Sequence, residues 1–258
     1  MYLETVQAQI RVVVALAIRD AEAEYARFRL GYLWAFAQPV IYVSLLTALT
    51  VFVRRVGVTA HDMTPVLFVV FGTLPWIAFS RTMGSMYRII YANKHVLQLP
   101  GATTFDVIAA HALVEFVTYN AVFIVFVTLG ALYENSWPPR NILSVILVFN
   151  SALALGCTVG MALIPVHRFF PAVEHFMIIF LRAGFWTAGL FFVISQVPNW
   201  AWPYFTWNPM LHVTELLRTY WFDAYQTPVG NPWYIVTCIV VFGLIGLAAD
   251  RLLRRAPV

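Results

Sequence analysis

The feature that most constrains the fold of this chain is a series of long apolar runs separated by short polar or proline-containing breaks. A helix needs about 20 apolar residues to cross the hydrocarbon core of a bilayer. Runs close to this length cover residues 34–53, 63–79, 105–132, 142–165, 171–194 and 232–250. Apolar residues make up 61% of the 258-residue chain and charged residues 11%, with a mean hydropathy of +0.77. We therefore predict an all-α integral membrane protein with six transmembrane helices, in one domain over residues 1–258.

The segment before these spans, residues 1–33, is expected to be an amphipathic helix that lies in the membrane surface. It has no Gly or Pro up to Leu30, and its charged residues fall mostly on one side. The apolar side is formed by Ile10, Val14, Ala17, Ala21, Tyr25 and Phe28. A cleaved secretory signal is not expected, because the early apolar run 12–18 is short and lies between Arg11 and Arg19.

The distribution of basic residues predicts the orientation. Six spans in residues 34–250 place both termini on one side, and most basic residues, including the tail 251–258, fall on that side. This favours cytoplasmic N- and C-termini. The residues on the other side would be Arg54, Arg55, Arg140 and Arg218. Arg54 and Arg55 oppose the rule that positive charges favour the cytoplasmic side. Either the other basic residues outweigh them in setting the orientation, or they meet an anionic ligand outside.

Two connections are too long to be simple turns. The inner one, residues 80–105, is expected to extend the second span and to turn at Pro100-Gly101, and Thr103 with Asp106 fits the start of the third span. The outer one, residues 195–231, is rich in Trp and Pro and contains a short helical stretch at 210–220. We expect short external re-entrant helices there, before the last span.

The chain has no nucleotide-binding loop of its own. Walker A requires Gly-x-x-x-x-Gly-Lys-Ser/Thr, and the single lysine, Lys94, follows Asn93. The chain therefore cannot supply its own P-loop ATPase, so an active pump of this kind would take its energy from a partner subunit or an ion gradient. No metal site is expected, because neither Cys157 and Cys238 nor the His-acid pairs supply three ligands at a metal spacing. Those pairs are His61-Asp62, Glu174-His175 and His212-x-x-Glu215.

Three ionisable residues fall inside predicted spans and are candidates for function: His111, Glu115 and Arg182. One interpretation is a proton relay for His111 with Glu115 and an anion-facing role for Arg182. The other is that Glu115 and Arg182 neutralise each other between helices.

The aromatic residues at the outer end and one glycine motif leave alternatives open. The aromatic residues form either an interfacial belt or a platform on which sugar rings stack. They are Trp200, Trp202, Tyr204, Phe205 and Trp207. Gly156 and Gly160, in the sequence GCTVG, permit close helix contact, either within one chain or between two.

Three stretches in register carry a resemblance to a known family. RLGYLWAFAQPV, ANKHVLQLPGATTFDVIAAHALVEF and WNPMLHVTELLR resemble the inner-membrane permease of ATP-binding-cassette exporters for bacterial capsule polysaccharides, the polysialic acid and group 2 capsule family. The likeness runs from about Arg19 to Arg251. It implies a transport permease rather than an enzyme, without a cofactor of its own. This permease would be a homodimer in the bacterial inner membrane, bound to two copies of a separate ATPase that holds ATP and Mg. It also implies a lipid-linked polysaccharide as substrate, with periplasmic and outer-membrane capsule export proteins as further partners. Nucleic acid is not expected as a partner, because the basic residues are spread as short clusters between the apolar runs.

The resemblance also implies roles for individual residues. The N-terminal helix and the inner connection would contact the ATPase, through Arg27, Arg29, Arg88, Asn93, Lys94, Leu97 and Arg168. Capsule polymers of the family are commonly acidic, so arginines and aromatic residues are expected along the substrate path: Arg54, Arg55, Arg182, Phe185, Trp186, Trp202, Tyr204, Trp207 and Arg218. The alternatives are a sibling permease that exports O-antigen, teichoic acid or a small hydrophobic compound, and a secondary transporter without an ATPase.

Overall fold

The computed structural model describes residues 2–25, 33–54, 63–98, 103–136 and 139–255. Within these residues all regular structure is helical and there is no strand, which confirms the all-α prediction. The longer helices are α1 (Tyr2–Tyr25), α2 (Leu33–Arg54), α3 (Pro65–Met86), α5 (Thr104–Tyr133), α6 (Ile142–Phe169), α7 (Val173–Thr187), α9 (Pro209–Trp221) and α10 (Pro232–Arg255). The short ones are α4 (Ile89–Ala92), α8 (Pro203–Thr206) and single 3-10 turns at Val96–Gln98, Ile194–Gln196 and Asn199–Ala201.

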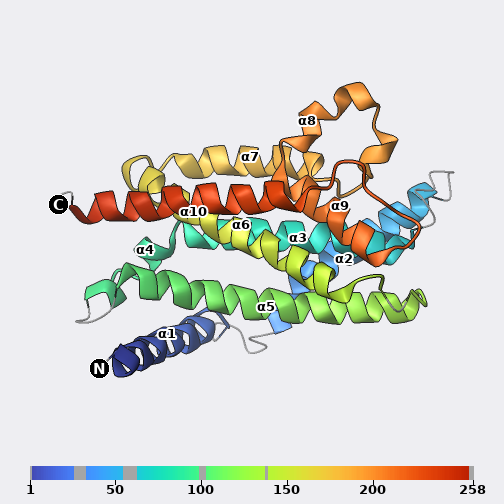
Figure 1. The fold of residues 1–258 in the computed structure, drawn as a ribbon. Helices are drawn as coiled ribbons and strands as arrows, with labels where there is room; N and C mark the ends of the chain where they lie inside the picture. The colour runs from blue at the N-terminus through green and yellow to red at the C-terminus, as the bar shows by residue number, and fades with distance from the viewer. Residues whose placement is uncertain (1, 26–32, 55–62, 99–102, 137–138, 256–258) are drawn as a thin grey trace.

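The long helices lie side by side, as Figure 1 shows for α3, α5, α6, α7 and α10. Both chain ends lie at one end of this bundle, together with α4, and we call it the terminal end. The helices α8 and α9 lie toward the opposite end, which we call the far end.

Four helices of the described part are long and apolar enough to cross a membrane: α3, α5, α6 and residues Pro232–Ala249 of α10. In α2 the apolar stretch Pro39–Leu49 is shorter than the stretches in these four helices. The fifth predicted span, 171–194, is wrong after Thr187, because α7 ends there. Its 15 residues rise about 22 Å, less than the hydrocarbon core of about 30 Å. Gly189 then adopts a φ of +72°, a left-handed conformation that ends the helix.

Close packing of α6 on α3 depends on the two glycines of the GCTVG motif. A β-carbon at Gly156 would lie 2.7 Å from the carbonyl oxygen of Phe79, and one at Gly160 would lie 2.6 Å from Cβ of Met86. The motif therefore serves a contact within the chain. On another side of α6, a β-carbon at Gly246 of α10 would lie 2.9 Å from Cβ of Met161.

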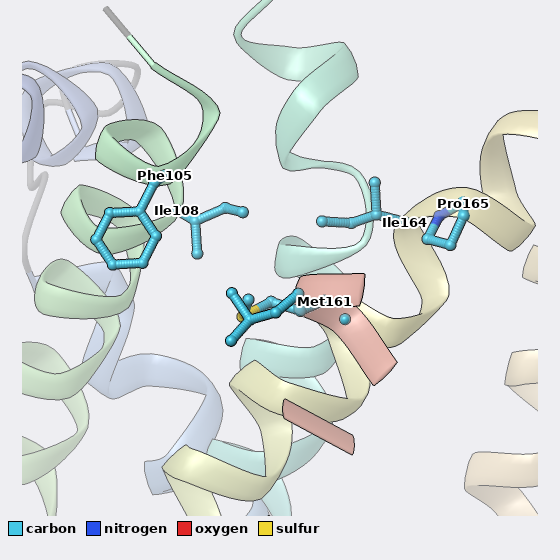
Figure 2. A pocket seen from close by; sticks show the side chains of 7 residues that line it. Phe105, Ile108, Met161, Ile164 and Pro165 are labelled. Atoms are coloured by element: carbon cyan, nitrogen blue, oxygen red, sulfur yellow. The ribbon is translucent and has the colours of Figure 1, made fainter. Parts of the chain in front are cut away.

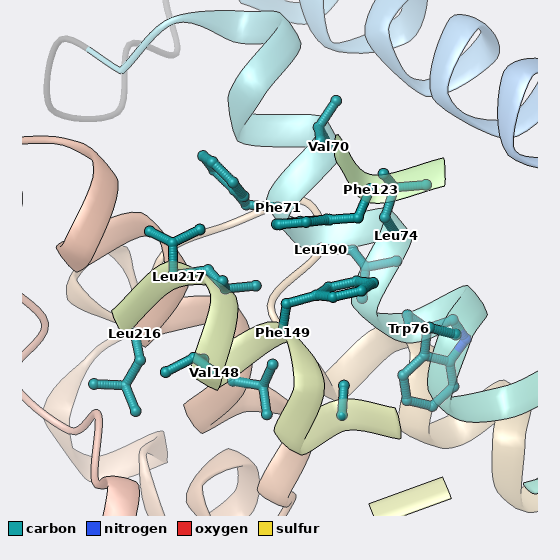
Figure 3. Packing of buried hydrophobic residues seen from close by; sticks show 14 of the residues in the cluster. Val70, Phe71, Leu74, Trp76, Phe123, Val148, Phe149, Leu190, Leu216 and Leu217 are labelled. Carbon is teal, nitrogen blue, oxygen red and sulfur yellow. The ribbon is translucent and has the colours of Figure 1, made fainter. Parts of the chain in front are cut away.

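The apolar core lies between α3, α5, α6 and α9 (Figure 3). Phe71 of α3 is fully buried, and the rings of Phe123 and Phe149 stack with their centroids 3.8 Å apart. Because the stacked rings come from α5 and α6, they join these two helices over the inner face of α3. This packing makes α3 the innermost helix.

Side-chain caps fix the starts of two helices. Thr103 and Asp106 form the predicted capping box of α5, with Thr103 N 2.9 Å from Asp106 Oδ2 and Asp106 N 3.3 Å from Thr103 Oγ1. The carboxylate of Glu134 accepts hydrogen bonds from the backbone N of Val66 (2.7 Å) and Leu67 (3.1 Å). These backbone groups have no partner within α3, so Glu134 caps that helix from across the bundle.

The helix α1 packs against the first half of α5. Ala17 is buried with Ala110 and Val114, and Gln9 Nε2 donates to Asp106 Oδ1 over 2.6 Å. The expected apolar face is correct for Ala17 and Ala21. Val14 is instead 43% exposed, because the contact with α5 uses Val13 and Leu16. That α1 lies in the membrane surface stays a prediction.

Candidate functional site

The backbone after α7, residues 188–202, is irregular apart from two 3-10 turns, and we call it the irregular segment. Polar side chains of α9 bind it. Thr214 Oγ1 donates to the carbonyl oxygen of Ala188 (2.7 Å), and Glu215 Oε1 accepts from the backbone N of Ile194 (3.0 Å). Backbone groups at this depth need protein partners, because lipid offers none. The helix α9 thus supplies the hydrogen bonds that a continuous fifth span would have made internally.

Arg218 is the centre of this arrangement. It is fully buried, and its guanidinium donates to the carbonyl oxygens of Phe192 (2.9 Å), Leu190 (3.3 Å) and Phe68 (3.3 Å). The guanidinium carbon also lies 3.9 Å from the centroid of the Phe68 ring. Arg218 was predicted on the substrate path. The structure places it in the protein interior instead, because the open carbonyls of the irregular segment take its donors.

The neighbouring polar residues of α9 have equally local partners. Glu215 also accepts a hydrogen bond from the hydroxyl of Tyr225, and burial together with the Glu215 charge raises the pKa of that phenol. The ring nitrogens of His212 lie 2.8 Å from the carbonyl oxygen of Thr206 and 3.0 Å from that of Val229. The pair His212-x-x-Glu215 is therefore part of the scaffold. No group of three metal-ligating side chains occurs among the described residues.

Other path candidates gather on α7 and the segment after it. Arg182 is exposed, as are Trp186 (65%), Tyr204 (68%) and Trp207 (47%). Phe185 is half-buried, with its ring centroid 6.1 Å from that of Trp76. Trp202 is half-buried and donates from Nε1 to the carbonyl oxygen of Val197 (2.9 Å).

Contacts between rings connect parts of this region. Phe185, Trp186 and Phe191 contact one another with centroids 5.4 to 5.7 Å apart. Phe180 of α7 reaches Trp207, which directly precedes the cap of α9 (6.3 Å). We call these five residues, Phe180, Phe185, Trp186, Phe191 and Trp207, the aromatic surface.

Glu115 does not pair with Arg182. Its Oε1 accepts from Ser85 Oγ (2.9 Å) and lies 3.4 Å from His111 Nε2, whereas Arg182 is exposed on α7. The structure therefore brings together His111 and Glu115, one turn apart on α5, and leaves Arg182 apart from them.

The coupling candidates lie at the terminal end, in the segment 87–98, which we call the coupling segment. Asn93 is buried and accepts a hydrogen bond from Arg19 of α1, while Leu97 packs half-buried in the cluster around Met86. Arg88 and Lys94 are exposed and lie over the rings of Tyr87 (5.2 Å) and Tyr91 (4.9 Å).

A histidine connects the coupling segment to α7. The ring of His167 packs on Tyr87 (5.3 Å) and Tyr91 (5.0 Å), and its Nε2 lies 3.0 Å from Glu174 Oε1 in the first turn of α7. Arg168, the next residue, is exposed at the end of α6. A displacement of the coupling segment would thus reach α7 through one packed side chain.

Several sequence-based candidates lie outside the described residues. These are Arg27, Arg29, Arg55, His61 and Asp62, and the side chain of Arg54.

Two cavities were not anticipated from the sequence. One, of about 20 Å³, lies between α5, α6 and α10 and is lined by apolar groups, including Phe105, Ile108, Met161, Ile164 and Pro165 (Figure 2). It is large enough for about one water molecule and offers no polar partners, so it is a packing space. The other, of about 290 Å³, lies between α3, α5 and α7 and carries charged residues. Among its lining residues, Arg88 and Glu115 were singled out from the sequence, each for a different role. The cavity itself was missed because residues from separate segments of the chain form it.

The fold defines a multi-pass helical membrane protein, and comparison with known proteins identifies its relatives. No family model matches the chain. The chain is 28% identical over 250 residues to the polysialic acid transport protein KpsM of Escherichia coli, covering 97% of this chain and 96% of KpsM. It is 28% identical over 256 residues to the capsule polysaccharide export inner-membrane protein CtrC of Neisseria meningitidis, covering 96% and 92%. The O-antigen export system permease protein RfbA of Myxococcus xanthus is 24% identical over 193 residues, covering 73% and 70%.

Capsule polysaccharide export inner-membrane proteins are thus homologues of this chain over nearly its whole length, which confirms the resemblance. The chain is accordingly a multi-pass inner-membrane protein of a transport class rather than an enzyme.

Proposed function

We propose that this chain is the membrane subunit of an ATP-driven exporter that moves lipid-linked capsular polysaccharide across the inner membrane. The observation that carries the proposal is the near full-length homology to KpsM and CtrC. The absence of a Walker A sequence from the chain agrees with it, since a separate ATPase subunit, with its ATP and Mg, would supply the energy.

In this proposal the chain crosses the membrane six times with both termini in the cytoplasm. The fifth crossing is α7, completed by the irregular segment and α9. Two copies would associate through exposed apolar faces. Such faces occur on α2, at Ile41 and Leu45, and on α7, at Ile179. The aromatic surface and Arg182 would then contact the polymer, with aromatic faces against sugar rings and the guanidinium against acidic groups.

The coupling segment, with Arg168 and α1, would rest on the ATPase. Exposed Lys94 can pair with acidic residues of that partner, and the Arg19 to Asn93 hydrogen bond makes α1 follow the segment. Movement of the segment would then pass to α7 through His167 and Glu174. Periplasmic and outer-membrane export proteins would receive the polymer.

Lys94→Glu is expected to weaken the association with the ATPase. Purification of the tagged wild-type chain from native membranes should recover a subunit with a Walker A sequence. The variant should recover at least about tenfold less of this subunit, because a glutamate at this position would repel the acidic residues of the ATPase with which Lys94 is proposed to pair. Quantitative mass spectrometry of the purified fraction measures this ratio.

The matched control is Arg140→Glu, the same charge reversal at an exposed residue just before α6, at the far end of the bundle. It should recover the subunit as wild type does. If no subunit with a Walker A sequence is recovered with the wild-type chain from membranes in which the exporter is active, the proposal of an ATP-driven pump is contradicted. If Lys94→Glu recovers as much of this subunit as the wild type, the assignment of Lys94 to the coupling contact is contradicted.

The similarity to RfbA supports one alternative, a permease for O-antigen. It covers 73% of the chain, against 97% for KpsM, and for this reason capsule export is preferred.

A further inference from the structure

The charged cavity between α3, α5 and α7 has the features of a binding site. Its volume is about 290 Å³, and it is formed by the last turns of α3, the start of the coupling segment, the middle of α5 and the first turns of α7. It therefore lies toward the terminal end of the bundle, where these ends of α3 and α7 are found (Figure 1). A cavity of this size accepts a headgroup rather than a whole sugar chain.

The α3 side of the cavity presents two guanidinium groups. Arg81 and Arg88 are exposed, and within the described part of the chain no carboxylate lies within ion-pairing distance of either. Arg88 is held in place, since its Nε donates to the carbonyl oxygen of Gly84 (2.9 Å) and its guanidinium lies over Tyr87. Its remaining N–H groups are available to a ligand.

The two carboxylates of the cavity already have partners on the protein. Glu115 is buried and bound by Ser85 and His111, and Glu174 lies 3.0 Å from His167. The ionic groups left for a ligand are therefore the cationic ones, and an anion is the chemistry they recognise. Guanidinium groups bind phosphate oxygens with paired, charge-assisted hydrogen bonds.

Beyond Glu174 in its first turn, the facing side on α7 is apolar. It consists of Met177, Ile178 and Leu181, and Ile178 is 51% exposed, so the apolar side continues onto the open surface of α7. A ligand that satisfies both sides has an anionic head and an apolar chain.

We propose that this cavity binds the phosphate headgroup of an anionic lipid-like molecule, with its apolar chain along α7. The inference rests on the proposed function for the identity of that molecule in the cell, where it would be the lipid end of the exported polymer. The binding itself needs neither the ATPase nor transport, so it is measured separately.

The test uses the full chain, purified in a neutral detergent, and three probes. Native mass spectrometry measures the binding of dioleoylphosphatidylglycerol, dioleoylphosphatidylcholine and glycerol 3-phosphate. The phosphatidylglycerol is expected to bind at least about tenfold more tightly than either other probe, because it alone combines a net anionic phosphate with acyl chains. Equally tight binding of glycerol 3-phosphate would show a site for a soluble anion and overturn the lipid-like ligand.

The variants assign the binding to this cavity. Arg81→Gln with Arg88→Gln should weaken phosphatidylglycerol binding at least about tenfold, and the double replacement by Lys should retain more than the Gln pair because it keeps both charges. The control Arg140→Gln removes one exposed guanidinium outside the cavity and should bind as wild type does.

Unchanged affinity in the Gln pair, or an equal loss in Arg140→Gln, would overturn the site. If the double Gln variant does not fold, the test compares the phosphatidylglycerol affinity of the double Lys variant with that of Arg140→Gln. A double Lys variant that binds as tightly as wild type would overturn the paired guanidinium contact. If the wild-type chain does not bind phosphatidylglycerol more tightly than the other two probes, while the ATPase subunit is recovered normally, this inference alone is rejected.

Discussion

Arg218→Met should prevent recovery of correctly folded protein. The substitution removes a fully buried guanidinium that donates to the carbonyl oxygens of Phe68, Leu190 and Phe192, and it leaves the Glu215 carboxylate buried one turn away. Removal of one member of a buried charged network typically costs about 3 to 5 kcal/mol, a large part of the stability of a domain. The expected result is a small monodisperse fraction in size-exclusion chromatography and a lower thermal midpoint in detergent.

The matched control for this prediction is Arg140→Met, which makes the same exchange at an exposed residue. Its monodisperse fraction and thermal midpoint should equal those of wild type, since exposed substitutions cost little. An Arg218→Met protein with wild-type behaviour would show that the irregular segment does not depend on this arginine.

Gly160→Ala should destabilise the protein, although Ala favours a helix over Gly by about 1 kcal/mol. The added β-carbon would lie 2.6 Å from Cβ of Met86 and 2.9 Å from the carbonyl oxygen of Met83, so α6 must move away from α3. Overpacking of this kind typically costs about 1 to 3 kcal/mol, which exceeds the gain in helix propensity. A fall in the thermal midpoint in detergent measures it.

Gly243→Ala is the control, because the same exchange occurs inside α10 where there is space. The nearest atom to its β-carbon, Cγ2 of Thr158, would be 3.4 Å away, an ordinary contact. The propensity gain then remains, and the midpoint should stay equal or rise. Equal falls for both variants would contradict the packing account.

The sequence predicted the helices well where apolar runs are long and uninterrupted. Each of the six predicted spans overlaps one of the longer helices, and four of those helices are long and apolar enough to cross a membrane. Thr103 with Asp106 marked the start of α5 correctly. These features are local, so the identity of neighbouring residues is enough to predict them. The end of α7 at Thr187 was missed, because the apolar run continues through Ile194 while the backbone leaves the helix at Gly189.

In the candidate site, too, positions that follow from the order of the helices were predicted and contacts between distant segments were not. Arg88 and Lys94 could be placed at one end of the bundle from topology, and both are exposed there. The interior role of Arg218 could not be predicted, since its partners are carbonyl groups of segments up to 150 residues away. One signal was present in the sequence: Thr214, Glu215 and Arg218 form a polar group in a helix that follows an irregular apolar segment.

The most direct test of the proposed function is the location of the polysaccharide in cells that lack only this gene. Cells should be fractionated, and the capsular polymer on the surface and inside should be quantified, with and without the gene restored on a plasmid. The proposal predicts that surface polymer is lost, that polymer still attached to lipid accumulates inside, and that restoration reverses both. Unchanged surface capsule in the deletion strain would contradict it, and loss of O-antigen alone would favour the sibling permease.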